Sequence, residues 1–321
     1  MKTMKWLIRR EVWENKGAFF RAPLILSAVM IFFLLLTLGM GKNLEHLKIN
    51  DMEYNHIGDA VSVGAGELAA IAEAISTQYM WFASPLFVML SFVIFFYCLN
   101  ALYEDRRNRS ILFWKSLPIS DTNTVLSKLI TAVVVIPLVC IVVASATALI
   151  AAILGCVALS AKGIHVFGLV LSTPDFYLTP FELLAILPVY FLWALPTVGW
   201  LLMVSSWARS KVFLWAVGVP GLSVVLLIWA EKMFGFGLNI GWYMKNIVAR
   251  LLLSIVPGGW LQVSANQVEK SFDLHKGGGT MSYMLMHSWE AIGSVDLWAG
   301  AVAGAVMIGV AIYMRRWREE A

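Results

Sequence analysis

Charged residues are scarce in this sequence. They make up 14% of its 321 residues, whereas hydrophobic residues make up 60%, and the mean hydropathy is +0.77. Because soluble domains contain about 25% charged residues, this composition excludes an ordinary soluble globular protein. It favours an integral membrane protein, since the apolar residues form runs long enough to cross a bilayer, which takes about 20 residues each.

Signals for metal, disulfide and nucleotide chemistry are also missing. The three cysteines have no paired spacing, and the five histidines have no H-E-x-x-H or other ligand spacing. The string closest to a Walker A, residues 39–43, lacks the loop spacing and the Ser or Thr that holds magnesium. We therefore predict no metal site, no catalytic residues and no cofactor bound by this chain. If ATP drives the protein, ATP and magnesium bind another polypeptide.

The apolar runs predict a single all-α transmembrane domain. Six spans are expected at residues 23–41, 79–103, 126–159, 181–207, 212–230 and 296–314. The basic, tryptophan-containing stretch 1–21 predicts an N-terminal interfacial helix. The first apolar run is longer than a usual signal-peptide core and lacks a clear cleavage site, so we interpret it as a retained span.

One further apolar stretch, 247–263, does not fit a span. It is short, and it contains Arg250, Pro257 and two glycines. We predict a re-entrant-like segment before the last helix. Lys and Arg exceed Asp and Glu in the N-terminal stretch, after the second and fourth spans, and at the C-terminus, so both termini are predicted to be cytoplasmic.

No Asp, Glu, Lys, Arg or His falls near the middle of any predicted span. Proton- or ion-coupled carriers normally need such groups at that depth, so their absence argues against a secondary carrier.

Small and aromatic residues recur at helical spacing inside the spans. Gly300 and Gly304 form a G-x-x-x-G pattern, and Ala144 and Ala148 belong to a small-residue stripe. Both patterns predict faces at which another helix approaches closely. Trp193 and Trp200 are candidates for a substrate path, although a stripe of this kind is more often a packing or lipid-facing surface.

The most strongly charged stretch between apolar runs is 103–128. Acidic residues and then arginines follow the second span, an apolar aromatic block comes next, and Pro118 interrupts a continuous helix. Ser120 or Asp121 is suited to cap the next helix. We predict a short surface helix at 104–117, a corner at Pro118, and then a new span.

This stretch resembles the loop between the second and third spans in permeases of the type-2 ATP-binding-cassette (ABC) exporter family. The matching features are the acidic and basic start, Ser110-Ile111-Leu112, Leu117-Pro118-Ile119-Ser120, and Lys128 opening a span. The six-span layout, the basic N-terminal segment and the long outer loop before the last span are similar too. Residues 254–261 resemble that family's segment before its last span.

The resemblance implies that 104–117 is a coupling helix seated in a groove of a separate ABC ATPase subunit. Its candidate contacts, polar at the start and aromatic near the end, are Glu104, Asp105, Arg106, Arg109, Ser110, Phe113, Trp114, Lys115 and Pro118. It also implies a unit of two ATPases and two permeases, identical or different, surrounded by lipid in a bacterial-type inner membrane. No nucleic-acid partner is expected.

These features leave three functions open. The favoured one is the permease subunit of an ATP-driven exporter, not itself an enzyme, which moves an amphipathic or lipid-like cargo by alternating access. The alternatives are an ion-coupled secondary carrier and a membrane-embedded enzyme that acts from the outer loops through His, Asp or Glu.

Overall fold

The computed structural model describes residues 2–40, 46–49, 52–55, 65–107, 120–261 and 281–317. Six helices in this part of the chain are long and apolar enough to cross a membrane: Gly17–Gly39, Gly66–Arg107, Asp121–Ala161, Pro174–Trp207, Val212–Phe234 and Val295–Trp317. Each includes most of one predicted span. The prediction of an all-α, multi-pass membrane protein with six spans is confirmed.

The first half of the chain forms α1 (Lys2–Glu14), η1 (Gly17–Arg21), α2 (Ala22–Gly39), the hairpin strands β1 (His46–Ile49) and β2 (Met52–Asn55), α3 (Ala65–Gln78), η3 (Tyr79–Ala83), α4 (Ser84–Arg107), α6 (Asp121–Ile130), η4 (Thr131–Val135) and α7 (Ile136–Ala161). The second half forms α8 (Phe167–Ser172), α9 (Pro174–Trp207), α10 (Val212–Phe234), α11 (Ile240–Tyr243), η5 (Met244–Val248), α12 (Ala249–Leu253), α14 (Met281–Glu290), η6 (Ala291–Gly293) and α15 (Val295–Trp317).

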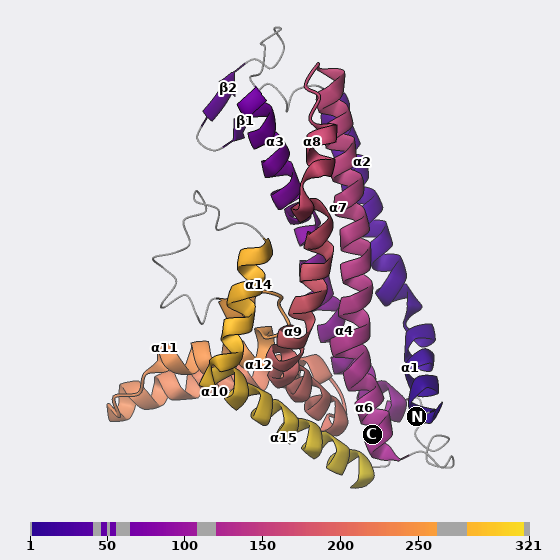
Figure 1. The fold of residues 1–321 in the computed structure, drawn as a ribbon. Coiled ribbons are helices and arrows are strands. Elements are labelled where there is room, and N and C mark those ends of the chain that lie inside the picture. The colour runs from indigo at the N-terminus through magenta and orange to yellow at the C-terminus, as the bar shows by residue number, and fades with distance from the viewer. Residues whose placement is uncertain are drawn as a thin grey trace.

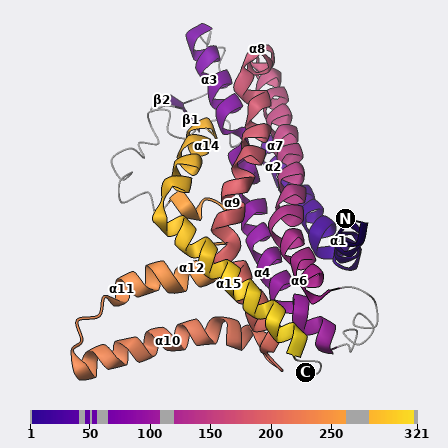
Figure 2. The same cartoon turned by 60° about the horizontal axis from the view of Figure 1, so that its bottom comes forward.

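Four long helices, α2, α4, α7 and α9, run alongside one another, and α15 crosses them obliquely (Figure 1). Helix α10 and the α11–α12 segment lie side by side and project to one side of this bundle (Figure 2). Both α1 and α15 pack against α6, so the first and last helices meet at the same end of the bundle. Leu7 of α1 is buried there, whereas Trp6 and Trp13 are exposed, as an interfacial helix requires.

Two helical distortions have a local cause. The π-helical turns η1 and η4 lie directly before Pro23 and Pro137. Proline has no N–H, and its ring collides with the carbonyl four residues earlier in a regular α-helix. The wider π turn gives the ring room, so each long helix continues past its proline.

Helices α9 and α15 approach each other very closely. An added Cβ at Gly304 would lie 2.5 Å from the carbonyl carbon of Leu195, and one at Gly199 would lie 2.6 Å from the carbonyl oxygen of Gly304. Only glycine lets the two backbones approach this closely. On α7, Ala144 and Ala148 are fully buried, and this helix packs against α2 and η3.

The segment before the last helix is broken and turns back, as predicted. After α12 the chain turns at Gly258, whose φ is +82°. Side chains satisfy the interrupted backbone: the Ser254 amide donates to Thr197 Oγ1 at 3.0 Å, and the Tyr190 hydroxyl donates to the Ile255 carbonyl at 2.9 Å. Irregular backbone persists inside a membrane protein where other parts of the protein supply such partners.

Candidate functional site

One end of the bundle, where α1, α4, α6 and α15 meet, holds a group of buried charged side chains. Their exposed fractions lie between 2% and 8%, and we call them the charge cluster: Glu11, Asp105, Arg106, Lys128 and Arg315. Removing a charge from water costs several kcal/mol unless it is paired and hydrogen-bonded, so their partners determine how this end is held together.

Lys128 of α6 joins α1 to α4. Its Nζ lies 3.0 Å from Glu11 Oε1 and 3.5 Å from Asp105 Oδ2. The Tyr97 hydroxyl donates to the other oxygen of Glu11 at 2.9 Å. The buried ammonium is therefore neutralised by two carboxylates from different helices.

Arg315 brings the last helix into the same cluster. Its Nη1 donates to Asp105 Oδ2, and its Nε donates to Asp121 Oδ1, both at 3.1 Å. Arg10 Nη2 lies 3.8 Å from the second oxygen of Asp105. Asp105 thus faces cations from α1, α6 and α15, so a displacement of α4 at this end acts on three other helices.

Arg106 fastens α4 to the end of α9. Its Nη2 donates to the carbonyl oxygens of Ser205 and Ala208, at 2.6 and 2.9 Å. In return, the Ser205 hydroxyl accepts hydrogen bonds from the backbone amides of Leu102 and Tyr103, each at 3.0 Å. A guanidinium at the last carbonyls of a helix also interacts favourably with the helix dipole.

These contacts revise part of the predicted coupling helix. Asp105 and Arg106 are buried and occupied by partners in their own chain, so we no longer assign them to a surface contact. Glu104 and Arg107 are exposed. Arg109, Ser110, Phe113, Trp114, Lys115 and Pro118 lie outside the described residues. Of the two predicted caps, Ser120 and Asp121, Ser120 caps α6 by accepting a hydrogen bond from the Asn123 amide at 3.2 Å.

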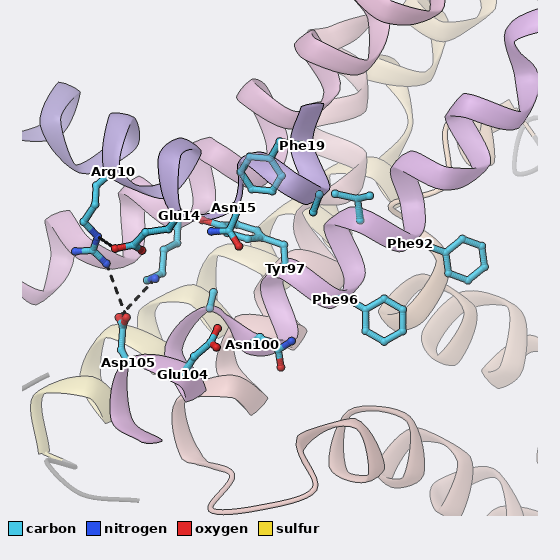
Figure 3. Close-up of a pocket in the computed structure, with 14 residues that line it drawn as sticks. Arg10, Glu14, Asn15, Phe19, Phe92, Phe96, Tyr97, Asn100, Glu104 and Asp105 are labelled. Carbon is cyan, nitrogen blue, oxygen red and sulfur yellow. Dashed lines mark ion pairs between the residues drawn. The ribbon is translucent and has the colours of Figure 1, made fainter. Parts of the chain in front are cut away.

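A cavity of about 800 Å³ adjoins the charge cluster (Figure 3). It lies between the start of the chain, α4 and α6, and its wall is charged on one side and aromatic on the other. The residues that line it are Arg10, Glu14, Asn15, Ala18, Phe19, Phe92, Val93, Phe96, Tyr97, Asn100, Ala101, Glu104, Asp105 and Lys128. Its volume is within the range of ligand pockets for drug-sized molecules.

The two tryptophans proposed for a substrate path make packing contacts with other described residues. Trp200 donates its indole N–H to the Ala216 carbonyl at 2.9 Å, which joins α9 to α10. Trp193 is 4% exposed, and its ring faces the Arg250 guanidinium carbon at 4.2 Å from the ring centroid. A cation over an indole face is attracted by the ring quadrupole.

Arg250 belongs to the run 247–263, which was predicted not to be a span, yet its side chain packs against α9 and α15. Its Nη1 donates to the Asp296 carbonyl, and an added Cβ at Gly300 would lie 2.5 Å from its Nη2. Its Nε and Nη2 are buried without an acceptor among the described residues. Gly300 therefore provides room for a guanidinium, in addition to lying on a helix-packing face.

We expect Gly300→Ala to lower the free energy of unfolding by about 1–3 kcal/mol, because the added methyl collides with the guanidinium. In an Arg250→Ala background the same change should cost clearly less, since the guanidinium is gone and only Pro196 Cγ, 3.1 Å from the added Cβ, still opposes it. Unfolding in detergent, followed for the four proteins of this double-mutant cycle, tests the prediction. Equal costs in both backgrounds would show that the two residues do not interact.

No group of three or more His, Cys, Asp or Glu that could hold a metal ion occurs among the described residues.

Within the charge cluster, the sequence singles out Asp105 and Arg106, but as surface residues. The sequence gives no signal for Glu11 and Arg315 as members of this cluster, because each is an ordinary charged residue beside an apolar run.

Comparison of the chain with protein-family models, curated proteins and solved structures finds no match.

Proposed function

We propose that this chain is the membrane-spanning permease subunit of an ATP-driven exporter of the ABC type. A separate ATPase subunit would bind ATP and magnesium, and the cargo would be an amphipathic or lipid-like molecule. Six membrane-spanning helices and the end-of-bundle charge cluster support this proposal.

The observation that carries it is the division of the last turn of α4 into two faces. Glu104 and Arg107 are exposed one helical turn apart, whereas Asp105 and Arg106 between them are buried. A partner can therefore contact one face while the other face is fixed to α6, α9 and α15. Pushing on this turn would move several spans together, as alternating access requires.

Arg250 does not supply the coupling that a proton-driven carrier needs. Arginine stays protonated in proteins, so it exchanges no proton during a transport cycle. Helices α2 and α10 have the smallest buried shares of the six spans, 11% and 17%. We propose that lipid and a second permease copy cover them.

We expect the tagged protein, purified from its native membrane, to bring with it an ATPase that contains a Walker A motif. The double charge reversal Glu104→Arg and Arg107→Glu should lower the co-purified ATPase activity at least about tenfold, because like charges would then face each other at the contact. A matched control is Glu73→Arg, which reverses an exposed charge on α3, the helix that precedes α4.

Full ATPase recovery with the charge-reversed protein would contradict the proposed contact. Absence of ATPase from the wild-type preparation, together with transport by the purified chain on a proton or sodium gradient alone, would favour the secondary carrier. Activity that depends on His275 or His287 and needs no ATPase would favour the enzyme.

A further inference from the structure

The cavity beside the charge cluster has two chemically different sides. Figure 3 shows Phe92 and Phe96 on one side, Arg10 and Asp105 on the other, and Phe19 and Tyr97 between them. Phe92 and Phe96 are 60% and 50% exposed although both belong to a membrane-spanning helix. An occupant therefore meets aromatic surface at one end of the cavity and ionised groups at the other.

Among the residues that line the ionised side, the three carboxylates of Glu14, Glu104 and Asp105 outnumber the two cations, Arg10 and Lys128. Asp105 is also paired with Arg315, which does not line the cavity, so Glu104 is the carboxylate left to attract an occupant. Both cations are already engaged: Arg10 Nε lies 3.0 Å from Glu14, and Lys128 lies within 3.5 Å of two carboxylates.

Glu104 differs from the other carboxylates of the cavity. It is exposed, and its side chain forms no ion pair or hydrogen bond with the part of the chain that the structure describes. An anion placed here would meet cations that are already neutralised and a free carboxylate that repels it. A cation would gain the attraction of Glu104 and of the neighbouring aromatic faces.

We propose that this cavity binds a cationic amphiphile, with its positive group beside Glu104 and its apolar part against Phe92 and Phe96. The volume of about 800 Å³ is sufficient for a drug-sized molecule. That such a molecule is also the transported cargo rests on the proposed function, but the binding site itself does not.

Two probes of the same shape and opposite charge test the proposal. Tetraphenylphosphonium and tetraphenylborate are titrated calorimetrically into the purified full-length chain in lipid nanodiscs, with the heat of empty nanodiscs subtracted. We expect saturable binding of tetraphenylphosphonium and at least about tenfold weaker binding of tetraphenylborate, because the two probes differ in the sign of their charge and Glu104 attracts only the cation.

Variants locate the site. Glu104→Gln should weaken tetraphenylphosphonium binding about tenfold, and Phe96→Ala should weaken it severalfold, since they remove the ionic and aromatic contacts respectively. Asp175→Asn, an exposed carboxylate on α9 that does not line the cavity, should leave the affinity unchanged. Unchanged binding in both cavity variants, or equal binding of tetraphenylborate, would overturn the proposal. Stronger binding of tetraphenylborate than of tetraphenylphosphonium would also overturn it and would favour an anionic lipid headgroup as the occupant.

This assay measures binding to the chain and does not require an ATPase, so it separates the two proposals. Tetraphenylphosphonium binding without a co-purifying ATPase would retain the site and reject the exporter. A co-purifying ATPase without such binding would retain the exporter and reject this site.

Discussion

Replacing Lys128 by methionine is expected to lower the free energy of unfolding by about 3–5 kcal/mol. The substitution keeps most of the side-chain volume but leaves Glu11 and Asp105, which are 2% and 8% exposed, without their shared ammonium. Arg10 and Arg315 still face these carboxylates, but removing the cation that both share leaves one buried negative charge unbalanced, which is strongly destabilising. Unfolding of the purified protein in detergent measures the effect.

A second variant separates lost pairing from lost packing. Combining Lys128→Met with Glu11→Gln removes both members of the closest ion pair within the charge cluster, so the double variant should be more stable than the sum of the two single changes predicts, by about 1–3 kcal/mol. Lys232→Met, on the exposed face of α10, is the matched control and should have little effect. If Lys128→Met cost no more than this control, the cluster would have no part in stability.

The second large effect is expected at the crossing of α9 and α15. Gly304→Ala places a methyl group 2.5 Å from the backbone of Leu195, where no flexible side chain can move aside. We expect a loss of about 1–3 kcal/mol, and Gly304→Leu should prevent the two helices from packing. The midpoint of thermal unfolding in detergent is the measurement.

Gly309 provides the control on the same helix. An added Cβ at this position meets no atom within 4 Å. Because alanine favours a helix by about 1 kcal/mol over glycine, Gly309→Ala should be neutral or stabilising. If Gly304→Ala destabilises the protein and Gly309→Ala does not, the lost stability at Gly304 comes from the helix crossing. Equal effects at the two glycines would contradict the close approach.

The last turn of α4 shows how far sequence reasoning reached. The sequence identified a charged stretch after the second span, and helical periodicity alone would place Glu104 and Arg107 on one face. It could not tell which face turns inward, because that depends on α6, α9 and α15, which come later in the chain. Asp105 and Arg106 were therefore predicted to be surface residues, although the packed helices bury them.

Arg250 illustrates the same limit inside the bundle. The run 247–263 was recognised as too short and broken for a span, and the structure confirms a segment that turns back. Only the packing of this segment on α9 places the guanidinium against Trp193 and beside Gly300. Gly304 was predicted to lie on a packing face, but its partner Leu195 was not predicted.

The sequence by itself determined the six spans, the broken segment and the cap of α6. Each of these depends on the hydropathy or backbone preference of neighbouring residues, which can be read along the chain. Only the tertiary structure decided the charge cluster and its cavity. Glu11 and Lys128 are 117 residues apart, and Asp105 and Arg315 are 210 apart. Such pairs form only when helix packing brings their side chains together and excludes water, which no local pattern specifies.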